Sequence, residues 1–130
     1  MNLLLDTHAL LWLLLEDDRL TRNTAAAIAD RANTIFVSAV TGIEVATKVR
    51  IGKLPHAVGV SRDLTNICSD FDFREVGITM AHAVAAGALP GPHRDPFDRI
   101  LAAQSLVEGL ALVTNDAAFA GFGTEVFWSP

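Results

Sequence analysis

Four acidic residues, far apart in the sequence, each stand beside a segment that would begin or end an element of an alternating fold. Asp6 follows the apolar run NLLL, and Asp116 follows LALVT in the segment TND. Glu44 lies in AVTGIEVATKVRIG, and Asp98 lies in HRDPFDRILAAQ. Carboxylates brought close together repel one another unless a cation lies among them. Hard oxygen ligands of this kind suit Mg²⁺ or Mn²⁺, so the four acids are candidate ligands of a divalent metal.

Short apolar runs alternate with longer helical patterns along the whole chain. The strands that we expect are 2–6, 34–38, 73–78, 110–114 and 125–128. The helices that we expect are 7–15, 20–32, 39–52, 58–70, 80–89 and 95–109, with one or two helical turns at 116–122. This alternation predicts an α/β fold, a three-layer α/β/α sandwich around a mostly parallel sheet of four to five strands. Ligands of such sheets bind beyond the carboxyl ends of the strands, where strand order reverses, and the four acids could converge there.

Each acid also has an ordinary structural interpretation. Asp6 and Asp116 are each well placed to cap the helix that follows. Glu44 and Lys48 are spaced as a helical surface ion pair. These interpretations each explain one acid, whereas the repeated placement at strand ends and in first helical turns favours a shared metal site.

The segment HRDPFDRILAAQ (93–104) combines a helix start with a candidate ligand. Asp95 is suited to the N-cap, Pro96 to the first helical position and Asp98 to the third. Asp98 is stabilised near the positive end of the helix whatever else it does. The segment therefore predicts a helix entry whose geometry aims Asp98 at the other carboxylates.

Composition limits the class of protein. With 130 residues, of which 51% are hydrophobic and 19% charged, we expect one globular domain spanning 1–130. The apolar runs are too short for a membrane span, and no signal peptide is indicated. Cys68 is the single cysteine, so a reducing, cytoplasmic compartment is expected. The net charge of −5 argues against a chain that is basic throughout, but it leaves a local basic patch open.

Four segments in order resemble the PIN-domain ribonucleases, most closely the VapC-type toxins of type II toxin–antitoxin systems. These segments are DTHALLW (6–12), SAVTGIEVATKVRIGKL (38–54), HRDPFDRILAAQ and LVTND (112–116). The resemblance implies a metal-dependent endoribonuclease that hydrolyses RNA with Mg²⁺, or with Mn²⁺, and leaves a 5′-phosphate. It assigns Asp6, Glu44, Asp98 and Asp116 to the acidic catalytic and metal site. It also implies a cognate VapB-like antitoxin and a homodimer.

Side chains beside the matched positions are candidates for supporting roles. Those expected to orient water or metal ligands are Thr7, Ser38, Asp95, Thr114 and Asn115. Those expected to contact RNA phosphates are Lys48, Arg50, Lys53, Arg94 and Arg99. Each of these cations is otherwise a solvated charge or a partner for a nearby acid. Trp12 is expected in the core with its N–H paired, and the apolar outer side of its helix is a candidate dimer face or antitoxin groove.

Other classes of protein were compared with this sequence, and two of them need residues that the chain lacks. A haloacid-dehalogenase-type phosphatase needs a second acid two residues after the first, where this chain has His8. A response-regulator receiver needs an acid after the third strand and a lysine after the last, and the last lysine is Lys53. A PIN nuclease of RNA processing that is not a toxin, or a binding module that holds RNA or a partner without cutting it, is separated from a toxin only by experiment.

Overall fold

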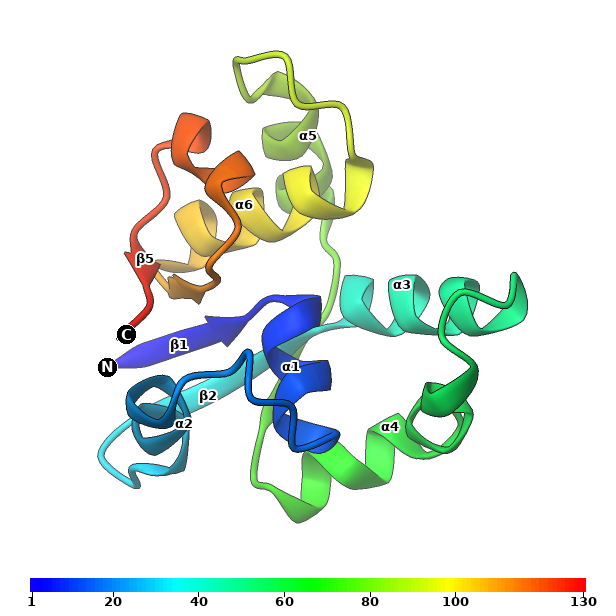
Figure 1. The fold of residues 1–130 in the computed structure, drawn as a ribbon. Helices are drawn as coiled ribbons and strands as arrows, with labels where there is room; N and C mark the ends of the chain where they lie inside the picture. Colours follow the sequence, from blue (N-terminus) through cyan, green and yellow to red (C-terminus); the bar gives the residue numbers. More distant parts are fainter.

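A five-stranded sheet, parallel throughout, forms the middle layer of the computed structural model, which describes residues 1–130 (Figure 1). The strand order is β3-β2-β1-β4-β5. The strands are β1 (Asn2–Leu5), β2 (Thr34–Ser38), β3 (Arg74–Val76), β4 (Ala111–Val113) and β5 (Val126–Phe127). The predicted α/β/α class is confirmed, and no antiparallel strand is present in the sheet.

Helices cover both faces of this sheet. They are α1 (Thr7–Leu14), α2 (Arg22–Ala29), α3 (Ala39–Arg50), α4 (Val58–Asp70), α5 (Met80–Ala88) and α6 (Pro96–Glu108). Two 3-10 helices, η1 (Pro55–Ala57) and η2 (Ala117–Phe122), complete the fold. Figure 1 shows α1, α2 and α4 on one side of β1 and β2, and α5 and α6 on the other. None of the helices combines the length and the apolar composition needed to cross a membrane.

The continuous apolar run in β1 is explained by burial on both faces. Leu3 and Leu5 pack in one core cluster with residues of α1 and α2, whereas Leu4 packs in a second cluster with Leu101 of α6 and Phe119 of η2. All three leucines of β1 are fully buried. Because side chains alternate across a strand, a central strand covered on both faces has no position for a polar residue before its end. The first polar side chain after this run is Asp6.

Strand order reverses between β1 and β4, which fixes the location of a ligand crevice. From β1 the chain adds β2 and β3 on one side, then returns to add β4 and β5 on the other. The Asp6 N–H donates to the Val113 carbonyl at 3.1 Å, so the end of β1 is joined to the end of β4. The residues that follow these two strands therefore share one edge of the sheet.

The observed elements differ from the predicted ones mainly at their ends. The predicted 34–38 and 58–70 match β2 and α4, although α4 has a non-helical residue at Asp63. The predicted helix 20–32 shortens to Arg22–Ala29, and Gly52, at φ +79°, follows the end of α3 as expected. The predicted turns at 116–122 form a 3-10 helix, and η1 was not predicted. The residues at which strands and helices end depend on contacts with neighbouring elements, and the periodicity of the sequence does not describe these contacts.

Removal of one central leucine tests the double burial of β1. We expect Leu4→Ala to lower the free energy of unfolding by about 2–5 kcal/mol, because it leaves a cavity in a packed layer. Ile51, just after α3, is 50% exposed, and Ile51→Ala should change the free energy by less than about 0.5 kcal/mol. Urea denaturation followed by circular dichroism measures both. Equal effects of the two substitutions would contradict the assignment of Leu4 to the core.

Candidate active site

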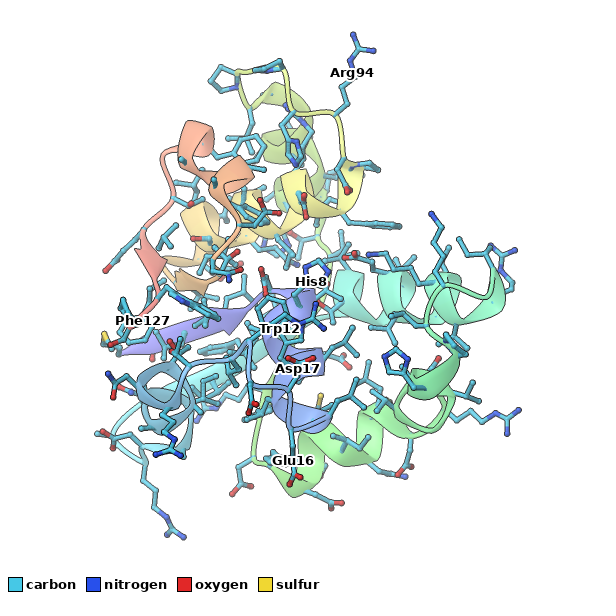
Figure 2. All side chains as sticks on the ribbon, in the orientation of Figure 1. His8, Trp12, Glu16, Asp17, Arg94 and Phe127 are labelled. Carbon is cyan, nitrogen blue, oxygen red and sulfur yellow. The ribbon has the colours of Figure 1, made fainter.

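All four predicted ligands, together with Asp95, line one small cleft at the carboxyl edge of the sheet. The cleft has a volume of about 130 Å³. Its lining consists of Asp6, Thr7, His8, Glu44, Lys48, Asp95, Asp98, Asp116 and Phe119. Figure 2 shows the side chains around His8 gathered where β1 meets the start of α1. Sequence segments that are more than 100 residues apart thus meet at the predicted location.

Asp6 occupies the end of β1 and also caps α1. Its Oδ1 accepts a hydrogen bond from the Ala9 N–H at 2.7 Å, and the residue is 4% exposed. Burial raises the pKa of Asp6 above its ordinary value, and the nearby charge of Asp98 adds to the rise. The Thr114 hydroxyl and the Ala9 N–H act in the opposite direction. Asp6 therefore caps α1 and also belongs to the acidic site.

Glu44 is a buried carboxylate with a donor on each oxygen. The Thr7 Oγ1 donates to Oε1 at 2.8 Å, and the Lys48 Nζ donates to Oε2 at 2.7 Å. Thr7 in turn lies 3.2 Å from the Thr41 hydroxyl. The pair with Lys48 exists as the helical spacing predicted, but Glu44 is 6% exposed and faces the cleft. Paired donors of this kind make burial of a carboxylate tolerable.

Asp98 stands in the first turn of α6, behind the cap that the sequence predicted. The Asp95 Oδ1 accepts from the Phe97 N–H at 2.9 Å and from the Asp98 N–H at 3.4 Å. The His93 Nε2 lies 2.7 Å from the Asp98 Oδ2. Burial raises the pKa of Asp98, and the charges of Asp95 and Glu44 raise it further, while His93 lowers it. The carboxylates of the cleft therefore act on one another electrostatically.

Arg99 fastens the segment that carries His93. Its guanidinium donates to the carbonyl of Ala86 at 2.9 Å, to the carbonyl of His93 at 2.9 Å and to the carbonyl of Leu89. It also lies 5.7 Å from the centre of the Phe122 ring. With its three nitrogen atoms engaged, Arg99 holds the connection between α5 and α6 against α6. An RNA contact by Arg99 would have to compete with these bonds.

The remaining predicted residues divide between the cleft and its surroundings. The Asp116 Oδ1 accepts from the Ala118 N–H at 2.9 Å, and the Thr114 Oγ1 accepts from the Asp116 N–H at 3.0 Å. Ser38 is buried and caps α3 by accepting from the Val40 N–H. Among the predicted supporting residues, Thr7 and Asp95 line the cleft, whereas Ser38, Thr114 and Asn115 do not.

The predicted RNA-contacting cations lie at different distances from the carboxylates. Lys48 belongs to the cleft wall. Arg50 and Lys53, at the end of α3 and just beyond it, are exposed. Arg94 is exposed and projects from the connection before α6 into solvent (Figure 2). A path for a phosphate backbone across these cations remains a prediction.

The donor chemistry of the cleft fits a hard divalent cation. Five carboxylates gather there with one lysine and one histidine. In this conformation no three imidazole, thiol or carboxylate groups are arranged closely enough to hold a metal ion. Glu44 and Asp98 instead have their oxygens paired with Lys48 and His93. Burial, with a smaller contribution from neighbouring carboxylates, raises the pKa of Asp6 and of Asp98, and a bound cation would favour their ionised forms.

Sequence reasoning missed three contributors to this site. His93 was not among the predicted site residues, yet it pairs with Asp98 five residues later. His8 lines the cleft, and Thr41 extends the hydroxyl chain behind Glu44. Trp12 was predicted to lie in the core with a paired N–H: it is half-buried and packs against the core cluster of β1, but its indole N–H makes no hydrogen bond in the protein. The proline- and glycine-rich run before His93 carries no periodic signal that could have placed its side chain.

Fold and cleft together define an α/β protein whose acidic site suits metal-assisted phosphoryl chemistry. A family model of the PIN domain matches residues 3–124. The chain therefore belongs to the PIN-domain family.

Known relatives agree with this assignment. The chain is 33% identical to Ribonuclease VapC22 of Mycobacterium tuberculosis (strain ATCC 25618 / H37Rv) over 116 residues, which cover 88% of this chain and 87% of that protein. Its fold is similar to that of a chain in the crystal structure of VapBC2 from Rickettsia felis bound to a promoter DNA fragment, with a TM-score of 0.73, 19% identity and coverage of 99% and 100%. It is also similar to a chain of FitAcB from Neisseria gonorrhoeae, with a TM-score of 0.70, 21% identity and 96% coverage of both chains.

Neutralisation of Asp6 should stabilise the metal-free protein. A carboxylate whose pKa is raised by folding opposes the folded state once it ionises, so stability falls as pH rises from its ordinary value of 3.8 through the raised value. Asparagine caps a helix as well as aspartate does. In EDTA at neutral pH, urea denaturation should therefore show a larger free energy of unfolding for Asp6→Asn than for the wild type.

The pH dependence and a matched substitution provide the controls. The advantage of Asp6→Asn should shrink as pH falls toward 3.8, where the wild-type side chain is protonated. Asp70, exposed at the end of α4, makes no side-chain hydrogen bond, so Asp70→Asn should leave stability unchanged at both pH values. An advantage that grows on acidification would refute the burial argument.

Proposed function

We propose that the chain is a Mg²⁺-dependent endoribonuclease and the toxin of a VapBC-type toxin–antitoxin pair. The observation that carries the proposal is the convergence of Asp6, Glu44, Asp98 and Asp116 on one cleft at the reversal of strand order. The likeness to Ribonuclease VapC22 over most of both chains supports RNA as the substrate. The domain extends over residues 1–130, and the expected compartment is the cytoplasm.

The four acids would hold the Mg²⁺ ion, or Mn²⁺ in its place. When bound, such an ion supplies an acidified water and neutralises charge on the phosphate. Asp6 is the most central ligand by its position at the end of β1. The cleft contains no serine or cysteine, and its one threonine, Thr7, is buried and uses its hydroxyl to hold the Glu44 carboxylate. We therefore propose hydrolysis by direct attack of water on phosphorus. The 5′-phosphate product is what the resemblance to the PIN-domain ribonucleases implies.

The surrounding side chains set the orientation and charge of these acids. Thr7 and Lys48 fix the Glu44 carboxylate by hydrogen bonds to its two oxygens. His93 fixes Asp98, and Arg99 holds the backbone of His93 in place. Such fixed partners preorganise ligands and prevent the acids from separating under their mutual repulsion.

Cations in the wall of the cleft and around it would contact the RNA backbone. Lys48, Arg50, Lys53 and Arg94 are the side chains that we propose for this role, because phosphates away from the metal need their own counter-charge.

Apolar surface outside the cleft supports the proposed partners. Large exposed apolar side chains on α5 and α6 are Met80, Val84, Leu106 and Val107. They suit a homodimer contact. The three leucines at the end of α1 and just after it, Leu13 to Leu15, are only half-buried, and they suit an antitoxin segment. The similar solved structures, VapBC2 and FitAcB, support a VapB-like antitoxin as the second partner.

Cleavage of a defined single-stranded RNA tests the enzymatic part of the proposal. Purified wild-type protein should cut the RNA in Mg²⁺ and stop when EDTA is added. Asp6→Asn should lower the cleavage rate by at least about a hundredfold, because several kcal/mol of transition-state stabilisation are lost with one ligand charge. Gel electrophoresis of end-labelled RNA measures the rate and the terminal phosphate.

The same assay separates the nuclease from its alternatives. Asp70→Asn should cut at the wild-type rate, since Asp70 lies outside the cleft. RNA that is bound but not cut by the wild type would indicate a binding module. Cleavage by Asp6→Asn at the wild-type rate would remove Asp6 from the active site.

Expression in a bacterial host tests the toxin part of the proposal. We expect wild-type protein to arrest growth, and Asp6→Asn to accumulate as folded protein without arresting it. Arrest should be reversed by co-expression of the antitoxin encoded beside this gene. Growth that continues in the presence of active wild-type nuclease would point to a PIN nuclease of RNA processing instead. Colony counts after induction provide the measurement.

A further inference from the structure

His8 presents an exposed imidazole ring at the edge of the cleft. It lines the cleft two residues after Asp6 and makes no hydrogen bond or ion pair in the protein. Four residues further along α1, Trp12 packs against it, with ring centres 5.6 Å apart and planes 22° from parallel. Residues spaced by four share one helix face. One face of the imidazole is thus backed by an indole ring, and the residue as a whole stays exposed.

Trp12 is itself held in place by neighbouring groups. The Trp128 ring meets it edge-on at 6.1 Å, and the Arg19 guanidinium lies 5.0 Å from its ring centre. Asp17 fixes Arg19 by a 2.7 Å ion pair and by a hydrogen bond to its backbone N–H. Figure 2 shows His8, Trp12 and Asp17 in succession along the same side of the molecule. The Trp12 ring, against which His8 packs, is therefore held in position by its neighbours.

We propose that the exposed face of His8 stacks against an RNA base next to the phosphate that is cut. This inference rests on the proposed ribonuclease function and adds a base-binding subsite to it. Stacking on an aromatic face is the usual way in which proteins bind single-stranded bases, and it tolerates any sequence.

The charge around His8 favours a base over a phosphate. The cleft beside it contains five carboxylates, so a phosphate that is not neutralised by metal would be repelled. A base is neutral and planar and adds no charge there. His8 lines the same small cleft as Asp6, so a base stacked on it would lie beside the phosphate that is cut.

A stacked pair elsewhere in the protein provides a comparison. Phe71 and Phe73 have ring centres 5.2 Å apart and planes 25° from parallel, and Phe71 is 51% exposed. This pair lies at the end of α4 and does not line the cleft. The geometry of the two pairs is alike, and of the two only the His8 pair adjoins the cleft. Phe71 is therefore the matched control site.

Single-turnover cleavage and RNA binding by the full chain test the proposal. The probe is a single-stranded RNA of about 12 nucleotides, used unmodified and with one base removed at successive positions. His8→Ala should raise the RNA concentration for half-maximal rate about tenfold and leave the maximal rate within about twofold. His8→Phe should restore binding, His8→Lys should not, and Phe71→Ala should match the wild type.

Base removal identifies stacking as the cause. At one position next to the cleavage site, loss of the base should weaken binding to the wild type about tenfold and leave binding to His8→Ala unchanged. Unaltered RNA affinity of His8→Ala, or rescue by His8→Lys and not by His8→Phe, would overturn the proposal. So would an effect of His8→Ala on antitoxin binding alone.

The outcome can be separated from that of the proposed function. Wild-type protein that cuts no RNA contradicts the nuclease, and fluorescence anisotropy of the same RNAs, with Ca²⁺ in place of Mg²⁺, then decides the stacking by itself. Cleavage that is lost in Asp6→Asn but insensitive to His8→Ala upholds the nuclease and removes the stacking site.

Discussion

Mutual repulsion among carboxylates at the carboxyl edge of the sheet is the constraint on which this structure depends. Asp6 and Glu44 are almost fully buried. Burial raises the pKa of Asp6 and of Asp98, and the charges of neighbouring carboxylates add to the rise. A fold accepts such a cluster only if its scaffold is firm and each acid has fixed donors. The two apolar layers around β1 provide the scaffold, because the leucines that precede Asp6 are sealed on both faces.

The hydrogen-bond donors that stabilise the carboxylates are largely backbone N–H groups in the first turns of helices. Asp6 caps α1, Asp95 caps α6 and Asp116 caps η2. The unpaired N–H groups of a first helical turn attract negative charge, so one residue can begin a helix and serve the cleft. Glu44, in the middle of α3, has no such group and relies on Thr7 and Lys48 instead. Capping and ligand roles are thus complementary in this fold.

Much of the fold could be predicted because the relevant signals are local. The β-branched run 34–38 became β2 with the same bounds, and the acids at 6, 44, 98 and 116 meet in one cleft. The partial exposure of Trp12 was not predicted, because helical periodicity describes a face but not how much of that face is covered. His93 was undervalued because the glycine- and proline-rich segment before it has no regular period, and its position depends on the bonds from Arg99.

The sequence by itself determined the alternation of strands and helices, the burial of β1 and the acids that follow strands or open helices. These features follow from the periodicity of apolar residues and from cap preferences, both of which act over a few neighbouring positions. Only the tertiary structure decided which hydroxyl and which cation hold Glu44, and that His93 reaches Asp98. It also decided that His8 lines the cleft with its ring packed against Trp12. Thr7 and Glu44 are 37 positions apart, and such contacts arise when elements pack together.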